Sequence, residues 1–291
     1  MEYIKLLIDS SIGVLEWTFN QILFNVPYSE NYFWGLILIS LVVWIFEIIF
    51  PWRKSQKIFR KGFWIDIIYM FFNFFLFSII IVGFYEAFNK LLFDLFGIAS
   101  NSIALIDLST FSQISQLIIF FITLDFFQWL THIMMHRFDF LWKFHKVHHS
   151  VKEMGFAAHF HYHWMENILY KPLKVFAVML IGGFEPEQAY LIHFLTITIG
   201  HLNHSNIKLS YGPLKYIFNN PIMHLHHHAS SSSNNFKTGV NFAISLSIWD
   251  YIFKTNYIPN ENGNTKLGYE GDQLMAKSFI GQLFYGFKKG D

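Results

Sequence analysis

Residues 114–149 read ISQLIIFFITLDFFQWLTHIMMHRFDFLWKFHKVHH. The first part, Ile114–Met135, is mostly apolar with a single acid, Asp125, and is long enough for a membrane helix, which needs about 20 such residues. The second part places histidines three and four residues apart. Residues with these spacings lie on one face of a helix. The stretch therefore predicts a membrane helix that leads directly into a helix-borne histidine cluster.

The composition of the whole chain indicates a membrane protein. Of its 291 residues, 53% are hydrophobic and 14% are charged, whereas a soluble domain carries about 25% charged residues. This excludes a soluble, fibrous or disordered chain, because too few charged side chains are present to cover a water-facing surface. Two more stretches, Phe33–Phe50 and Phe63–Phe84, are apolar and long enough to span a bilayer. Each holds one acid, Glu47 or Asp66, and pairing inside the bundle is the favoured interpretation of both.

The distribution of positive charge predicts the orientation. The linker Pro51–Gly62 contains five Lys or Arg residues and no acid, so the positive-inside rule places it in the cytoplasm. The spans then alternate, and everything after Met135 emerges on the cytoplasmic side. The apolar segment 168–204 is interrupted around Gly182 and Gly183, which predicts two antiparallel helices that enter and leave on that side.

We therefore expect an all-α integral membrane fold with four transmembrane helices, or five if the N-terminal helix also crosses. Residues 1–30 are predicted to form an interfacial helix and residues 31–135 the first membrane helices. Residues 136–291 are predicted to form the catalytic region, with the membrane hairpin 168–204 and a cytoplasmic, helical, His-rich cap. The amphipathic stretch Leu274–Phe287 is expected to rest on the membrane surface.

Ten histidines at ligand-like spacings are the candidate metal ligands. They are His132, His136, His145, His148, His149, His201, His204, His224, His227 and His228. The chain has no cysteine, which excludes Cys-ligated zinc and iron–sulfur clusters. One zinc takes three or four protein ligands, so this number fits two ions better. Imidazole suits iron, copper, zinc and nickel, and a redox-active pair of irons that binds dioxygen is favoured, with zinc as a possible substitute.

Three motifs carry a family resemblance. They are His132-x3-His136, His145-x2-His148-His149 and His224-x2-His227-His228, with His204-Ser205-Asn206 between the second and third. Their order and spacing resemble the fatty acid hydroxylase and sterol desaturase superfamily of integral-membrane di-iron enzymes, most closely the branch of alkylglycerol monooxygenases and sterol C5-desaturases. The resemblance covers about residues 125–255 and includes Asn220-Pro221 and the motif WDYIFKT at 249–255. It implies that these motifs and His204 bind the metals; His201 is no regular ligand of the family.

The chain departs from the family pattern at several positions. Lys254 and Ala243 stand where relatives have glycine, and the segment 161–166 reads HYHWME where relatives often read Arg-x-His-Pro-x-Glu. His163 and Glu166 match that motif, whereas His161 and Trp164 do not. These departures concern the surroundings of the motifs and leave the histidine spacing intact.

Three acids, Asp125, Glu166 and Asp250, are predicted to lie at the site. Asp125 precedes His132 by seven residues on the same helical face, and it or Glu166 is placed to orient a ligand imidazole, as carboxylates around metal sites do. Asp250 follows Trp249 in a family-like motif. Two interpretations of Asp250 stay open, the same orienting role or a helix or turn cap.

The resemblance implies an oxidoreductase that uses dioxygen to hydroxylate or desaturate an unactivated C–H bond of a lipid, such as a fatty acyl, sterol or alkylglycerol-like substrate. Electrons would come from an external cytochrome b5- or ferredoxin-type reductase system, because the chain has no dinucleotide fingerprint and no cysteine. The net charge of +1 gives no field for a nucleic-acid partner. A zinc-dependent membrane hydrolase and a metal transporter are the alternatives; one zinc per chain favours the hydrolase, and ligands at the bilayer midplane favour the transporter.

Overall fold

The computed structural model describes residues 1–97, 104–183, 186–230, 239–259 and 263–287. Helices of the first half are α1 (Glu2–Ile22), η1 (Tyr28–Glu30), α2 (Tyr32–Ile49), α3 (Phe63–Phe71), the π-helical turn η2 (Phe72–Leu76), α4 (Phe77–Phe96), α5 (Gln113–Arg137) and α6 (Asp139–His149). Those of the second half are η4 (Phe156–Phe160), α7 (Trp164–Met179), α8 (Pro186–His204), η5 (Gly212–Tyr216), α9 (Pro221–His227), α10 (Ile248–Ile252), η6 (Asp272–Leu274) and α11 (Phe279–Leu283). The strands β1 (Ile106–Asp107) and β2 (Ile181–Gly182) form one parallel pair. The predicted all-α class is confirmed.

Three helices are long and apolar enough to cross a membrane in the described part of the chain. They are Tyr32–Ile49, the continuous helix Phe63–Phe96 and Gln113–Arg137. They match the three spans predicted from sequence, except that the first ends at Ile49 instead of Phe50 and the second continues from the predicted end at Phe84 to Phe96. These helices and the apolar composition identify an integral membrane protein.

The predicted hairpin 168–204 is present as two helices, α7 and α8. The first begins at Trp164, before the predicted start, and Pro172 lies inside it. Neither helix is among the three candidate spans of the described residues, so a count of four membrane helices stays a prediction. The predicted break between these helices includes residues 184 and 185, which lie outside the described residues.

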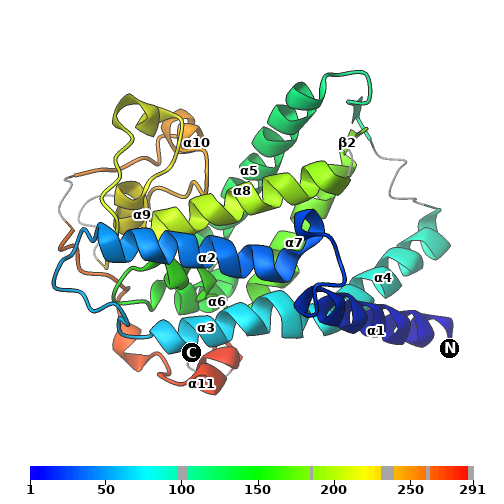
Figure 1. Ribbon diagram of the computed structural model, residues 1–291, viewed down its shortest axis with the longest axis horizontal. Helices are drawn as coiled ribbons and strands as arrows, with labels where there is room; N and C mark the ends of the chain where they lie inside the picture. Colours follow the sequence, from blue (N-terminus) through cyan, green and yellow to red (C-terminus); the bar gives the residue numbers. More distant parts are fainter. Residues whose placement is uncertain (98–103, 184–185, 231–238, 260–262, 288–291) are drawn as a thin grey trace.

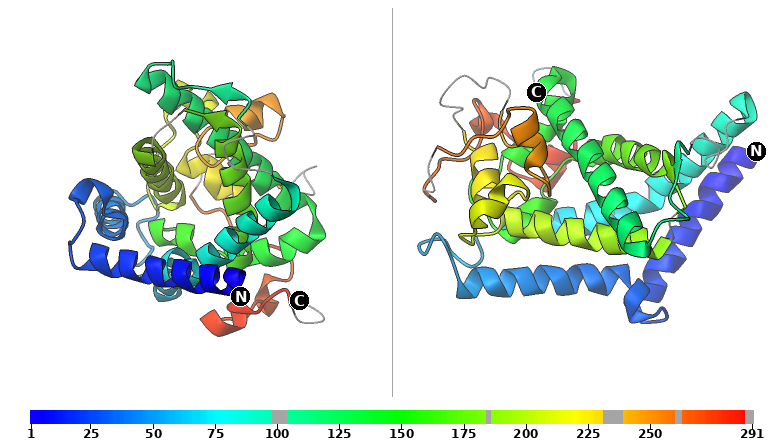
Figure 2. Two further views of the ribbon diagram at one scale, coloured as in Figure 1. Left: turned by 90° about the vertical axis from the view of Figure 1, so that its right-hand side faces the viewer. Right: turned by 90° about the horizontal axis from the view of Figure 1, so that it is seen from above.

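The N-terminal helix α1 packs along α4. At Gly83 the two helices approach so closely that a Cβ atom would lie 2.5 Å from the carbonyl oxygen of Leu7, so this position requires glycine. The pair extends from the body of the protein, as the view from above shows (Figure 2). The apolar side chains Ile4, Ile8 and Phe19 of α1 are exposed, and an interfacial position of this helix stays a prediction.

The linker between α2 and α3 lies at the same end of the bundle as α6 and α9 (Figure 1). The backbone N–H of Trp52 donates to the carbonyl of Asn206 (2.7 Å), and the Arg53 guanidinium donates to the carbonyl of Met154 (2.8 Å). Arg60 is buried. One of the linker's five positive charges, Arg53, therefore holds the linker against the segment that follows His149.

The C-terminal stretch Leu274–Phe287, which is predicted to rest on the membrane surface, is not one continuous helix. Only the five residues of α11 are α-helical. Ser278 caps this helix by accepting from the N–H of Gly281 (3.1 Å), and Gly286 has a left-handed φ of 89°, which ends helical geometry. Leu274, Ile280 and Phe284 nevertheless remain exposed.

Candidate metal centre

Five imidazoles form the first histidine cluster, with one ligand atom each and all five atoms within 4.8 Å of one another. Its members are His132, His136, His145, His149 and His227. They come from the end of α5, from α6 and from α9, so the cluster depends on the packing of three helices. The His132 and His145 Nε2 atoms are 3.2 Å apart, and the Nε2 atoms of His136, His149 and His227 have no partner among the described residues.

Four imidazoles form the second histidine cluster, again with all ligand atoms within 4.8 Å. Its members are His148, His204, His224 and His228. The Nε2 atom of His204 lies 3.3 Å from that of His148 and 2.9 Å from that of His224. Nitrogens that ligate one tetrahedral metal through bonds of about 2.0–2.1 Å stand about 3.3 Å apart. The second cluster therefore has the dimensions of a metal site.

The positions of the imidazole protons in the second cluster also favour a bound cation. A backbone carbonyl only accepts hydrogen bonds, so His148 donates from Nδ1 to the carbonyl of His161 (2.9 Å) and His204 donates from Nδ1 to that of Gly200 (2.7 Å). Burial lowers the pKa of His148 to about 3, so the ring carries only one proton at neutral pH. Its Nε2 lone pair therefore faces another imidazole, an arrangement that a bound cation stabilises.

The first cluster is built in the same way. His132 donates from Nδ1 to the carbonyl of Phe242 (2.7 Å) and His227 donates to that of Val240 (2.8 Å). Burial, together with the neighbouring imidazoles, also holds the pKa of His145, His149 and His227 well below the usual value. Neutral rings with orphaned Nε2 atoms are the form that binds metal, and the donor set fits a metal pair.

The local sequence explains how α9 presents three histidines to the two clusters. Asn220 caps its N-terminus by accepting from the N–H groups of Ile222 (3.0 Å) and Met223 (3.1 Å), and Pro221 occupies the first helical position, where its missing N–H costs nothing. His227 then faces the first cluster, while His224 and His228, one helical turn apart, face the second. His226 belongs to neither cluster.

A cavity of about 150 Å³ adjoins both clusters. Five of the imidazoles line it, namely His132, His145, His148, His204 and His224. From there it continues between α7 and α8, where Glu166, Tyr170 and Thr196 are among its lining residues. A small molecule or the end of a lipid in this cavity would lie directly beside the metal ligands.

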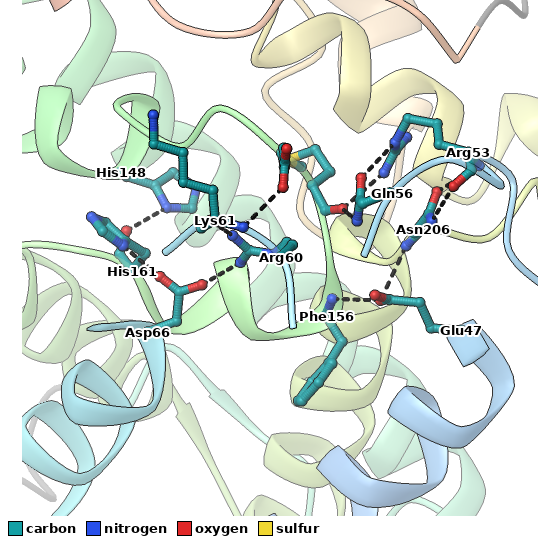
Figure 3. A network of polar contacts seen from close by, with 12 residues as sticks. Glu47, Arg53, Gln56, Arg60, Lys61, Asp66, His148, Phe156, His161 and Asn206 are labelled. Atoms are coloured by element: carbon teal, nitrogen blue, oxygen red, sulfur yellow. Dashed lines mark hydrogen bonds and ion pairs between the residues drawn. The ribbon is translucent and has the colours of Figure 1, made fainter. Parts of the chain in front are cut away.

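A network of one ion pair and several hydrogen bonds connects Asp66 to His148 of the second cluster (Figure 3). The Asp66 carboxylate pairs with the Arg60 guanidinium and lies 2.6 Å from Nδ1 of His161, and the carbonyl of His161 accepts from His148. In the same view Glu47 accepts from the N–H groups of Phe156 (2.8 Å) and Asn206 (3.1 Å). Both acids thus have partners inside the bundle, as the sequence predicted. Asp66 reaches the second cluster indirectly, because it contacts His161, whose carbonyl accepts from His148.

Replacing Asp66 with asparagine is expected to lower stability by about 3–5 kcal/mol, because the buried Arg60 loses its anionic partner. We also expect weaker metal retention at the second cluster, since His161 loses the group that positions it. Thermal unfolding in detergent and metal content measure the two effects. The control is Glu153→Gln, an acid of the same network whose carboxylate accepts from the backbone N–H of Lys61 at the exposed edge; an equal effect of both substitutions would contradict this role of Asp66.

The three predicted acids occupy different positions. Glu166 Oε2 lies 3.3 Å from Nδ1 of His145, which is close enough to orient the ring, although the two atoms are not aligned for a hydrogen bond. Asp125 contacts no ligand imidazole; it accepts from the N–H groups of Ser245 and Leu246 (both 3.0 Å) and from Trp249 Nε1 (3.0 Å). Although it shares a helical face with His132, it is engaged by the loop that packs against that face.

Asp250 is compatible with both roles considered for it, a turn cap and a group that helps to orient a cluster imidazole. Its carboxylate accepts from the N–H groups of Phe242 (3.0 Å) and Ala243 (2.8 Å), and from Trp129 and Thr255. It is therefore a turn cap. However, the turn it caps presents the Phe242 carbonyl that fixes His132, so Asp250 acts on the first cluster through one peptide unit.

His201 is not brought to the other nine histidines. Its Nε2 lies 3.0 Å from the Ser40 hydroxyl and its Nδ1 lies 2.7 Å from Nδ1 of His159. His201 precedes His204 by three residues, but the two rings diverge because His201 packs against α2 and η4. His163 also lies outside both clusters, with Nε2 2.9 Å from the carbonyl of Leu283.

Sequence reasoning did not identify the outer contacts of the clusters. The carbonyls of Gly200, Val240 and Phe242 fix ligand rings, yet a backbone carbonyl leaves no signature in a sequence. His161 was noted only as a departure from the family motif. The sequence signal for this network is the single acid in each of the first two spans, Glu47 and Asp66.

Comparison with known proteins agrees with the geometry. The sequence model of the family named "Fatty acid hydroxylase" matches residues 117–255. Over 175 residues, 60% of this chain, the sequence is 29% identical to the ornithine lipid hydroxylase OlsE of Rhizobium tropici, covering 51% of that protein. It is 28% identical over 146 residues to the human alkylglycerol monooxygenase, with 48% of this chain and 30% of the relative covered. The match thus spans about half or less of these relatives. No solved structure matches the chain. The segment 117–255, which holds every histidine of both clusters, belongs to the fatty acid hydroxylase family.

Proposed function

We propose that this protein is a membrane-bound di-iron oxygenase that hydroxylates an unactivated C–H bond of a lipid with dioxygen. The observation that carries the proposal is the pair of adjoining all-histidine clusters beside one cavity. Nine imidazoles in two groups of five and four exceed what one zinc ion uses, which favours a metal pair. The names of the relatives, a lipid hydroxylase and an alkylglycerol monooxygenase, support hydroxylation of a lipid.

The chain's own residues would hold the metals and exclude water. The first cluster would hold one iron and the second the other, and the pair would supply oxygen activation when bound. Glu166, whose Oε2 atom lies 3.3 Å from Nδ1 of His145, would favour the tautomer that carries the proton on Nδ1 and leave Nε2 to bind metal. The cavity between α7 and α8 orients the substrate beside the imidazoles that line it. Hydroxylation consumes one dioxygen, two electrons and two protons for each C–OH and water formed, and the electrons come from an external reductase system of the cytochrome b5 or ferredoxin type.

Product analysis tests the proposal. Iron-loaded protein in vesicles of lipid from its host, supplied with a reductant and ¹⁸O₂, is expected to yield a lipid heavier by one ¹⁸O atom. The zinc-loaded protein serves as the control, because zinc has no redox chemistry. Hydrolysed lipid with the zinc-loaded protein would favour the hydrolase, and a lipid lighter by two hydrogens would assign desaturation instead of hydroxylation.

We also propose that both clusters face the cytoplasm. The positively charged linker supports this orientation, and it contacts Glu153, Met154 and Asn206 at the histidine end of the bundle. A cysteine introduced at Lys57 in this cysteine-free chain is expected to resist a membrane-impermeant thiol reagent in intact cells and to react after lysis. A cysteine at Tyr28, an exposed residue before α2, is expected to react in intact cells; the reverse pattern would contradict the orientation.

A further inference from the structure

A lysine lines the cavity that adjoins the metal centre. Lys174 lies on α7 and shares this cavity with Glu166 and Tyr170 of the same helix and with His193 and Thr196 of α8. Glu166, Tyr170 and Lys174 follow one another at intervals of four residues, so they form one stripe along a face of α7. The positively charged Lys174 side chain is therefore one of the residues that line the cavity.

Lys174 has no carboxylate within ion-pair distance among residues 1–97, 104–183, 186–230, 239–259 and 263–287. Its ammonium lies 5.9 Å from the centre of the Tyr170 ring, a contact worth about 0.5–2 kcal/mol. Asp125 on α5 is already engaged by the loop at 245–249. Lys174 is half-buried, and an anion that pairs with an ammonium offsets the cost of withdrawing it from water, so the cavity offers a positive charge to an anionic ligand.

The lysine and the metal centre mark two ends of the cavity. Eight residues separate Lys174 from Glu166, which contacts His145, and this corresponds to about 12 Å along the helix. On α8, eleven residues separate His193 from the ligand His204, or about 16 Å. Glu166 is therefore too far along α7 to neutralise Lys174, and a bound molecule can reach the ammonium and the histidines at once.

We propose that Lys174 binds the anionic group of the substrate, a carboxylate or a phosphate, and that the substrate is consequently an acidic amphiphile. The inference rests on the proposed function, since it describes the same cavity. The anion anchors one end of the molecule, and the C–H bond to be oxidised lies about 12 Å away beside the clusters. Lys174 is a binding residue that sets specificity; it takes no part in the oxidation.

Binding of three matched probes tests the assignment. Decanoate, decyl phosphate and decanol share one alkyl chain and differ in the headgroup, and isothermal titration of the metal-loaded protein in a neutral maltoside detergent measures each affinity. We expect one or both anions to bind at least tenfold more tightly than decanol. Lys174→Met is expected to remove that preference through a loss of about 10–100-fold in anion affinity, with decanol binding unchanged, and Lys174→Arg is expected to keep it.

Lys171→Met is the matched control. Lys171 lies one turn earlier on α7 and contacts the Ser78 hydroxyl (3.4 Å) instead of the cavity, so its loss is expected to leave the anion preference intact. Equal binding of all three probes by the unmodified protein, or an anion preference that survives Lys174→Met, would overturn the inference. The two proposals fail separately: lipid hydroxylation without any effect of Lys174 refutes only the anion site, whereas a Lys174-dependent anion preference without oxygenated product refutes only the proposed reaction.

Discussion

Replacing both His224 and His228 with alanine is expected to leave one iron per chain instead of two. The two residues supply half of the second histidine cluster from one face of α9, and only His148 and His204 would remain. Two imidazoles do not hold a metal that needs three or four protein ligands. The first cluster, which takes only His227 from this helix, is expected to keep its iron. Iron content by elemental analysis measures the change.

His226→Ala is the control for this experiment, because His226 lies on the same helix and belongs to neither cluster. It is expected to keep two irons and substantial turnover. The single variant His227→Ala is expected to lose more turnover than the roughly 10–100-fold typical of an outer partner, since it removes a direct ligand of the first cluster. Full turnover with normal iron content in His227→Ala would refute the assignment of the first cluster.

Asp250→Asn is expected to weaken iron binding at the first cluster by about 10–100-fold. The buried carboxylate accepts four hydrogen bonds, and an amide group presents an N–H₂ to at least one donor. A buried donor left without an acceptor costs about 1–3 kcal/mol. The turn that carries the Phe242 carbonyl then loosens, and with it the ring of His132.

Iron retention during dialysis against a chelator, together with thermal unfolding, measures this effect. Asp139→Asn provides the comparison, because Asp139 is an exposed acid in the first turn of α6 and makes no contact with a cluster. Iron retention in Asp250→Asn equal to that in Asp139→Asn would show that the Phe242 turn does not depend on the carboxylate.

The sequence predicted the long helices and the nine imidazoles that the structure brings together, but not the division of those imidazoles between the two clusters. His148 and His149 are neighbours, as are His227 and His228, and each pair is split between the clusters. Successive residues of a helix point about 100° apart, so neighbours cannot face one metal. Which cluster each neighbour joins depends on how α6 and α9 pack, and this packing is not encoded in local spacing.

The positions of His201 and Asp125 away from the two clusters have one cause. Helical periodicity predicts which residues share a face, but not which neighbouring element occupies that face. His201 meets Ser40 and His159, and Asp125 meets the loop at 245–249. Lys254, which replaces a glycine of the family pattern, adopts a left-handed φ of 58°. The family glycine is thereby explained, since this conformation costs least without a side chain.

The most direct test of the metal pair is the iron stoichiometry of protein purified without air and reconstituted with ferrous iron, combined with Mössbauer spectroscopy. Two clusters of five and four imidazoles predict two irons per chain in two distinct nitrogen-rich environments. The variant His224→Ala/His228→Ala is expected to lose one of the two signals. A single iron per chain in the unmodified protein, or one zinc that resists exchange while the protein stays active, would contradict the account.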